Sequence, residues 1–218
     1  MSEKFRNKYR SESARLKNWD YGSNGAYFIT ICTKNREHFF GEIDPETQTM
    51  QLNQIGKLAE QFWLEIPVHF PFVELGEFVV MPNHTHGVLI IDKNETNGFG
   101  NDGKLGYSNT DRNVGDDIVG TRLIASLQYH PQHQTNSEST KKIGGITGDK
   151  NPMIHNNISR IIRWYKGRST FEMRKINPHF AWQPRFHDHI IRNQFAFDRI
   201  QKYIANNPLN WKEDRFGK

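Results

Sequence analysis

Residues 73–92 have the sequence VELGEFVVMPNHTHGVLIID, and the fold prediction depends on this stretch. Its two halves, residues 73–80 and 85–92, are rich in β-branched and aliphatic residues, which favours two strands. Between them, Met81-Pro82-Asn83 contains residues that are typical of tight turns. We therefore expect a β-hairpin whose second strand lies in the centre of a sheet, because an apolar run follows Gly87.

Five further segments surround this hairpin in the sequence. Residues 27–33 (YFITICT) form a β-branched and aromatic run that predicts a first strand, and residues 182–191 predict a fourth. Apolar residues at helical spacing predict helices over 51–66 and 195–206, which Pro67 and Pro208 are expected to end, and a helix that begins at Ile158. The order β-α-β-β-α-β-α indicates an α+β fold: a ferredoxin-like (RRM-like) antiparallel sheet with helices on one face and an additional C-terminal helix.

Residues 94–150 differ in composition from the rest of the chain. They are rich in Asn, Gly, Asp, Ser and Thr, with seven acidic and six basic residues. Structureless runs beyond about 12–15 residues are unusual within compact domains. We therefore interpret this segment as a polar insertion or mobile loop within a single domain of residues 1–218, which begins with a basic arm at 1–18.

Composition excludes several classes of protein. No run approaches the roughly 18 apolar residues of a membrane span, and the charged start of the chain lacks the apolar core of a secretory signal. A single cysteine, Cys32, excludes an internal disulfide framework and a four-cysteine zinc site. We expect a cytoplasmic, nucleoid-associated protein without a membrane partner.

The net charge of +5 is concentrated in two segments and favours an anionic partner. Residues 1–18 carry six basic and two acidic residues, and residues 158–175 carry six and one. Solvated surface charge explains either segment alone, but Trp164, Tyr165 and Phe171 interleave the second, which favours a nucleic-acid surface. The candidate DNA-binding residues are Arg160, Arg163, Lys166, Arg168, Arg185 and Arg192.

His84 and His86 are two residues apart on the predicted second strand of the hairpin, so both side chains project from one face. Two imidazoles on one face can supply two nitrogens to a divalent metal. Ordinary core or surface histidines also occur in this pattern, and the pair alone leaves that interpretation open.

Tyr203 and Asn207 are four residues apart on the predicted last helix and therefore lie on one face of it. A phenol and an amide could then meet at one metal site, with Asn207 completing the coordination and Tyr203 supplying a nucleophile. The alternative is that Tyr203 packs in the core with Phe197, Ile200 and Ile204.

Two other positions compete for these roles. His187 and His189 form a second His-x-His pattern, but Arg185 before it and Arg192 after it favour a strand that faces DNA. Tyr165 is the competing nucleophile, although its basic surroundings are more typical of phosphate binding or base stacking.

Three segments resemble the REP-associated tyrosine transposases, which belong to the single-tyrosine HUH transposase superfamily (His, hydrophobic residue, His). The segments are MPNHTHG at 81–87, WQPRFHDHIIRN at 182–193 and YIANNP at 203–208. Residues 14–36, ARLKNWDYGSNGAYFITICTKNR, are also similar to the start of that family. The resemblance covers residues 14–93 and 152–212. It departs from the family pattern at Thr85, where a bulky apolar residue is usual, and in the insertion.

The resemblance implies roles for the candidate residues. His84 and His86 would bind Mg²⁺ or Mn²⁺, with Asn207 where relatives place a polar amide ligand, and Tyr203 would attack a phosphate in single-stranded or hairpin DNA. The product would be a 5′-phosphotyrosine link and a 3′-hydroxyl, and rejoining would need no ATP. No Walker-type phosphate loop is present, so we expect no nucleotide cofactor. Relatives include dimers and monomers, which leaves a homodimer open.

Two other functions could use the same residues. A ferredoxin-like sheet can serve as a non-catalytic module that binds single-stranded nucleic acid. A metal-dependent nuclease could use water in place of the tyrosine.

Overall fold

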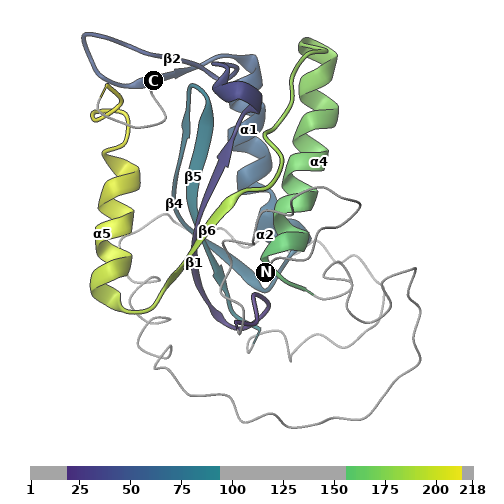
Figure 1. Ribbon diagram of the computed structural model, residues 1–218, viewed down its shortest axis with the longest axis vertical. Helices are drawn as coiled ribbons and strands as arrows, with labels where there is room; N and C mark the ends of the chain where they lie inside the picture. Colours follow the sequence, from purple (N-terminus) through teal and green to yellow (C-terminus); the bar gives the residue numbers. More distant parts are fainter. Residues whose placement is uncertain (1–18, 94–155, 213–218) are drawn as a thin grey trace, which may run out of the picture.

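The computed structural model describes residues 19–93 and 156–212, in which a four-stranded sheet forms the centre (Figure 1). The strand order is β4-β5-β1-β6, and every neighbouring pair is antiparallel. This is the ferredoxin-like arrangement, so the α+β prediction is confirmed. The strands are β1 (Gly25–Cys32), β4 (Val73–Met81), β5 (His84–Ile91) and β6 (His187–Ile191).

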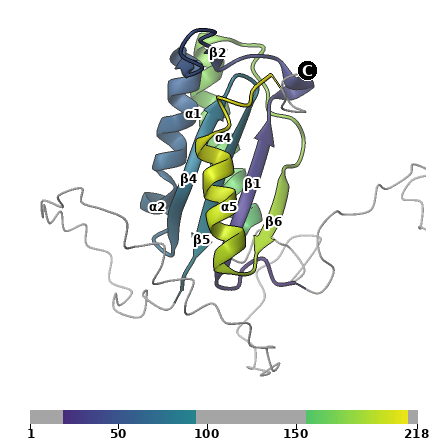
Figure 2. The same cartoon turned by 90° about the vertical axis from the view of Figure 1, so that its left-hand side faces the viewer.

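Helices cover both faces of this sheet (Figure 2). Helices α1 and α4 lie on one face, as predicted, and the additional C-terminal helix α5 lies on the other. Each of these three helices begins after an asparagine whose side-chain oxygen accepts a backbone N–H from the first turn, which stabilises the helix start. The helices are α1 (Gln54–Leu64), the short α2 (Ile66–His69), α4 (Ile158–Ile176) and α5 (Gln194–Ala205), and the capping residues are Asn53, Asn157 and Asn193.

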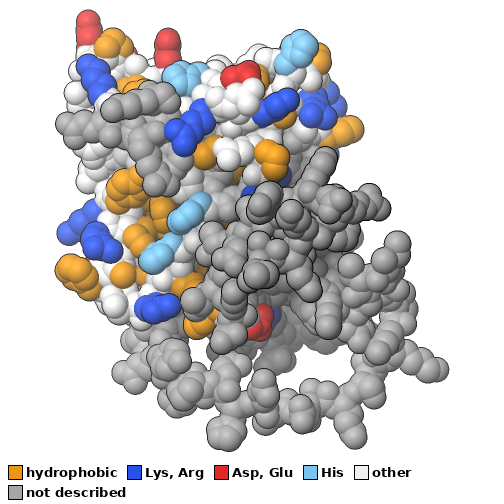
Figure 3. Space-filling view, viewed as in Figure 1, with side chains coloured by type: hydrophobic (Ala, Val, Ile, Leu, Met, Phe, Trp, Pro, Cys, Tyr) orange, Lys and Arg blue, Asp and Glu red, His pale blue; other side chains and the backbone are white. Residues whose placement is uncertain are grey.

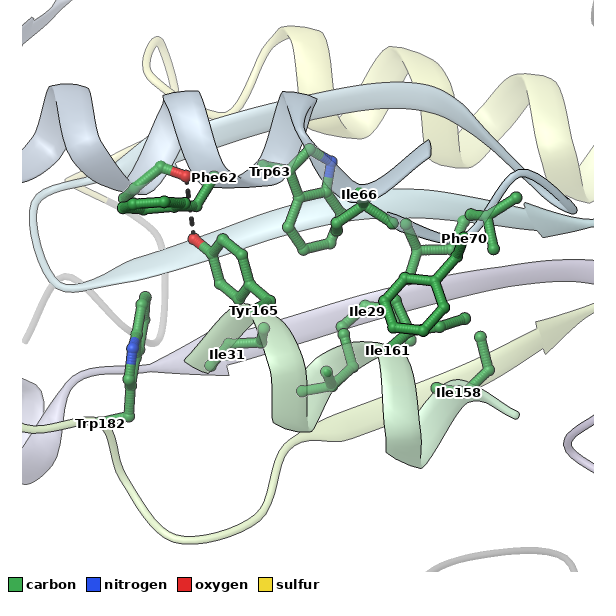
Figure 4. Packing of buried hydrophobic residues seen from close by; sticks show 14 of the residues in the cluster. Ile29, Ile31, Phe62, Trp63, Ile66, Phe70, Ile158, Ile161, Tyr165 and Trp182 are labelled. Atoms are coloured by element: carbon green, nitrogen blue, oxygen red, sulfur yellow. Dashed lines mark hydrogen bonds between the residues drawn. The ribbon is translucent and has the colours of Figure 1, made fainter. Parts of the chain in front are cut away.

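The larger core lies between the sheet and the α1–α4 layer (Figure 4). Alternate residues of β1, among them Ile29 and Ile31, point into this layer and are fully buried. Trp63 of α1 and Tyr165 of α4 pack there edge to face, with their ring centroids 5.3 Å apart. Burying this apolar surface is the main favourable term that holds the helices on the sheet.

The β4–β5 hairpin is confirmed, and its tip is fixed by hydrogen bonds to neighbouring loops. Pro82 and Asn83 form the two-residue turn, so that Met81 pairs with His84. The carbonyl of Asn83 accepts hydrogen bonds from both the backbone N–H and the hydroxyl of Thr33. The start of β5 is therefore held in one position relative to the end of β1.

A second hairpin, β2 (Gly41–Ile43) with β3 (Met50–Leu52), was not predicted. It takes residues 51–52 out of the predicted first helix, which begins later because Asn53 caps it. Pro67 was predicted to end that helix, and this is wrong: Pro67 lies in the first turn of α2, where its missing N–H is tolerated.

The predicted strand 182–191 is shorter than expected. Only residues 187–191 form β6, and Trp182 makes a single bridge to Thr33. Between them Arg185 adopts a left-handed backbone conformation (φ 69°), which interrupts a regular strand.

The predicted basic arm (1–18) and insertion (94–150) lie outside the described residues. Among the helices that are described, none has the length and apolar character needed to cross a membrane.

The described residues on either side of the insertion contact each other. The Lys93 side chain donates to the carbonyl of Asn156, and its backbone N–H donates to the side chain of Asn24. We expect deletion of residues 97–140 to leave the thermal unfolding midpoint within about 5 °C of the full chain, because shortening a loop between adjacent ends changes closure entropy little. Circular dichroism melting of both proteins measures this. Loss of cooperative unfolding after the deletion would show that the segment belongs to the core.

Candidate active site

The strand β5 places His84 and His86 on the face of the sheet that α5 covers, as the two-residue spacing predicts. Their ring centroids are 4.4 Å apart, and the two residues are 0% and 1% exposed. Two adjacent imidazoles that are removed from water are an unusual feature, because histidine is more often partly exposed.

The hydrogen bonds of Asn83 fix the ring of His84. The Asn83 amide nitrogen donates to the carbonyl of Arg36, which leaves the amide oxygen to accept from His84 Nδ1 at 2.8 Å. The proton of the neutral ring therefore sits on Nδ1, and Nε2 presents a lone pair. Burial lowers the pKa of His84 to about 3, with a smaller contribution from the positive charge of Arg36, so the ring is neutral at pH 7.

His86 is held by β1. Its Nδ1 forms a 2.8 Å hydrogen bond with the hydroxyl of Thr30, which lies directly opposite on the neighbouring strand. The ring of Phe28, also on β1, stacks on His86 with a centroid distance of 5.1 Å. These contacts direct Nε2 of His86 toward α5, where it lies 3.4 Å from the hydroxyl of Tyr203.

Tyr203 does not pack in the core. Phe197, Ile200 and Ile204 occupy the buried face of α5, whereas Tyr203 is 42% exposed at the edge of that face. The ring of Phe28 meets Tyr203 edge-on at 6.0 Å, and the Tyr203 ring lies 5.5 Å from that of His86, so the tyrosine is beside His86 and partly exposed to solvent.

Asn207 lies beside His84, although the last helix does not place it there. Helix α5 ends at Ala205, and Asn207 belongs to the turn that follows, because the residue before Pro208 disfavours the helical conformation. The Asn207 side chain is 1% exposed and lies close enough to His84 to oppose part of the lowering of the pKa of that ring. The expected i, i+4 pair on one helix face is therefore wrong in detail, but both side chains reach the histidines.

Four residues of this site were not found from the sequence: Phe28, Thr30, Asn83 and Trp211. Trp211 stacks against His84 with ring centroids 6.0 Å apart. Phe28 and Thr30 could have been found by aligning the predicted first strand with the hairpin, since alternate residues share a face. No local pattern in the sequence marks Trp211.

The opposite face of β5 explains the residues between and after the histidines. Thr85 points into the core toward the hydroxyl of Tyr165. A Cβ on Gly87 would lie 2.3 Å from an atom of the Trp63 ring, so the close packing of α1 on this strand requires glycine.

Tyr165 is not available as a nucleophile or as a base-stacking residue. It is fully buried, and its hydroxyl donates to the carbonyl of Ala59 at 3.1 Å (Figure 4). Burial raises the pKa of this phenol. The prediction that Tyr165 faces DNA is wrong because it continues the apolar face of α4 that begins with Ile158 and Ile161. Of the three interleaved aromatic residues, only Phe171 is exposed.

The second histidine pair lies on the edge strand β6. His187 is opposite Thr30, which separates it from His86, so both pairs share one face but are two strands apart. His187 and His189 are exposed. Within residues 19–93 and 156–212, no group of three or more His, Cys, Asp and Glu side chains is placed to hold a metal ion.

Several Lys, Arg and His side chains lie on the face shown in Figure 3. The predicted DNA-binding residues do not form one patch but fall into separate groups. Arg163, Lys166 and Arg185 line a groove of about 560 Å³ beside α4. Arg168 instead forms an ion pair with Glu172 at 3.1 Å, and Arg160 hydrogen-bonds the Asn156 side chain. Arg192 is exposed just after β6.

Lys166 has a structural contact within this groove. Its ammonium donates to the carbonyls of Gln183 and Arg185, at 2.6 and 2.9 Å. Burial lowers its pKa to about 8.

Comparison with known proteins finds one relative over nearly the whole chain. No family model matches. An uncharacterized protein of Haemophilus influenzae is 35% identical over 208 residues, which cover 95% of this chain and 93% of that protein. The chain belongs to the family of that protein.

Two solved structures are similar to this member of the family. One is a REP-associated tyrosine transposase bound to a REP hairpin, with 17% identity, coverage of 92% of this chain and 74% of that chain, and a TM-score of 0.48. The other is a candidate transposase from Deinococcus radiodurans, with 15% identity, coverage of 89% and 97%, and a TM-score of 0.38. Both descriptions name transposases.

The buried hydroxyl of Tyr165 gives a first test of the site. Tyr165→Phe removes its hydrogen bond and should lower the free energy of unfolding by about 1–2 kcal/mol in urea denaturation, while any activity on DNA persists. Loss of DNA cleavage in a folded Tyr165→Phe protein would return this tyrosine to the site.

The neutral state of His84 predicts a pH dependence of stability. Its pKa is about 3 in the folded protein and about 6.5 in an unfolded chain. Below pH 6.5 the unfolded chain therefore binds a proton that the folded protein does not, and stability falls as the pH drops toward 4. In urea denaturation between pH 7 and pH 4, His84→Gln should reduce the slope of stability with pH by about one proton. An equal slope in both proteins would mean that the folded protein takes up a proton at His84 over the same pH range as the unfolded chain.

Proposed function

We propose that this chain is a tyrosine transposase of the REP-associated type, which cleaves and rejoins single-stranded or hairpin DNA through a 5′-phosphotyrosine link to Tyr203. The observation that carries the proposal is the 3.4 Å approach of the hydroxyl of Tyr203, a partly exposed residue, to Nε2 of the buried His86, beside His84. A protein with this substrate works in the cytoplasm, at the nucleoid.

The donor set of the site suits a divalent metal. His84 and His86 offer imidazole nitrogens, and Asn207 offers an amide oxygen from a buried position. This combination suits Mn²⁺, and Mg²⁺ accepts it when water or phosphate oxygens fill the remaining positions. A bound Mg²⁺ or Mn²⁺ would polarise a phosphate oxygen and stabilise the charge that develops on it.

Residues behind the histidines orient them for this task. Asn83 and Thr30 each engage an Nδ1 atom, which directs both Nε2 atoms toward the side where Tyr203 and Asn207 lie. Such partners fix the tautomer and the orientation of metal-ligating rings. Phe28 restricts the ring of His86 by stacking, and Trp211 restricts His84 in the same way.

Tyr203 then performs the covalent step. Its phenol oxygen attacks the phosphorus atom, a tyrosine–phosphate ester bond forms, and the bond to the 3′-oxygen of the neighbouring nucleotide breaks. The phenol releases its proton, and the departing 3′-oxygen takes one up to become a hydroxyl. The ester conserves the bond energy, so a 3′-hydroxyl can reverse the step without ATP.

The tyrosine is the residue to test first. Tyr203→Phe removes one oxygen from a half-exposed side chain, so folding and DNA binding should persist while the covalent product disappears. Labelled palindromic single strands are incubated with the protein and Mn²⁺ and analysed on a denaturing gel. Tyr165→Phe is the matched control and should still form the product. A covalent product from Tyr203→Phe would move the nucleophile elsewhere.

The same assay separates the two other functions. A nuclease that uses water would release cut DNA without a protein-linked band, and a binding module would leave the DNA intact. Either result with the unaltered protein would replace the proposed function.

Substitutions of the histidines test the metal. His84→Ala and His86→Ala should each abolish the covalent product through loss of metal, and raised Mn²⁺ should restore part of it if the remaining ligands still bind. Asn207→Ala should reduce activity less, because water can occupy the vacated position. Calorimetric titration of the Tyr203→Phe protein with Mn²⁺ measures metal binding without cleavage. Full activity in a chelator would exclude the metal role.

A further inference from the structure

We propose that the groove beside α4 binds the sugar–phosphate backbone of the same DNA that enters the Tyr203 site. A single DNA strand would then run from one face of the sheet to the other around β6, the β-strand at the edge. This inference rests on the proposed function and adds the path of its substrate. The groove lies between α4 and residues 181–186.

The charge of the groove suits phosphates. Among the described residues that line it, four are basic and none is acidic. Trp182 and Phe186 add apolar surface, and Ser159 and Thr170 add hydroxyl groups. Nucleic-acid backbones are recognised by such a combination of cations and hydroxyl donors. The basic residues are Arg163, Lys166, Arg174 and Arg185.

Hydrogen bonds fix the wall of the groove to α4. The Trp182 indole donates to the Ser169 hydroxyl at 3.1 Å, and Arg174 Nε donates to the carbonyl of Phe180 at 2.9 Å. The Lys166 ammonium bonds the two carbonyls of residues 183 and 185 described above. The segment between Phe180 and β6 is therefore anchored at several points along the helix, and the groove is preorganised.

These hydrogen bonds fix the backbone conformation of Arg185. It adopts a left-handed backbone conformation that non-glycine residues rarely take, and its carbonyl is held there by Lys166. Backbone strain of this kind is concentrated at functional sites. Lys166 is thus a positioning residue, and Arg185 and Arg163 are the residues that we expect to contact phosphate.

The groove and the Tyr203 site lie on opposite faces of the sheet. The groove is beside α4, whereas Tyr203 is on α5, which covers the other face. Residues 181–186 lead directly into β6, the edge strand, which displays His187 and His189 on the Tyr203 face. A DNA strand that leaves the groove at Arg185 therefore reaches Tyr203 by crossing the edge of the sheet at β6.

The chain offers a matched control on the same helix. Arg168 is paired with Glu172, and its guanidinium lies over the Phe62 ring at 5.5 Å rather than in the groove. If general surface charge determined affinity, Arg168 would matter as much as Arg163. If the groove determines it, only Arg163 and Arg185 will matter.

The test measures DNA binding in the Tyr203→Phe protein, which separates binding from cleavage. A fluorescent hairpin oligonucleotide with single-stranded flanks is titrated by anisotropy at several NaCl concentrations. R163Q/R185Q should weaken binding at least tenfold and lower the slope of log affinity against log salt by about 1–2, as expected for two lost phosphate contacts. R168Q should change affinity less than twofold. K166M alone should weaken binding, but the K166M/R185Q double variant should bind DNA no more weakly than R185Q. Thermal melting is the folding control.

Unchanged affinity and slope in R163Q/R185Q would overturn the proposal, as would an equal loss in R168Q. When the DNA is shortened stepwise, R163Q/R185Q should stop weakening binding at a length that still forms the covalent link to Tyr203. If the effect persists on the shortest DNA that forms the link, one strand does not join the two faces. If the unaltered protein forms no link but R163Q/R185Q still weakens binding, the proposed function fails while the groove remains a DNA site.

Discussion

The burial of two imidazole rings side by side at the start of β5 is the constraint on which the rest of this structure depends. A buried ring must stay neutral and must satisfy its N–H, since an unmet polar group in the interior is unfavourable. Asn83 accepts the Nδ1 proton of His84, and the hydroxyl of Thr30 hydrogen-bonds Nδ1 of His86. The turn that presents Asn83 and the register that places Thr30 opposite His86 are therefore parts of the site as much as the histidines are.

The two faces of the sheet carry different tasks. The α1–α4 face contains most of the large apolar side chains and holds the fold together. The α5 face is packed by a smaller apolar cluster near the far end of β5 and β1, which leaves the end near the hairpin turn to polar groups. Because α5 is anchored by Phe197, Ile200 and Ile204, Tyr203 can remain at the margin of the core without weakening the helix contact.

Much of this arrangement could be predicted from the sequence, for physical reasons that differ between elements. Strand alternation is local, so the shared face of His84 and His86 followed from their spacing. Tyr165 was misassigned because its basic neighbours do not indicate which side of the helix faces the sheet. Its spacing from Ile158 and Ile161 does indicate that side. Helix α5 ends before Asn207 because proline disfavours the helical conformation in the residue that precedes it, whereas the prediction placed Asn207 on the helix. Trp211 and the β2–β3 hairpin depend on tertiary contacts that no short pattern encodes.

The absence of one methyl group at Gly87 links these two faces. Trp63 of α1 lies against the backbone of β5 at this position, immediately after His86. The Trp63 ring on one side of β5 and the His86 ring on the other side are therefore separated by the backbone of adjacent residues alone. A change in the packing of α1 would reach the histidine pair through a single backbone unit, and the spacing between Tyr203 and the histidines would change without any alteration of those residues.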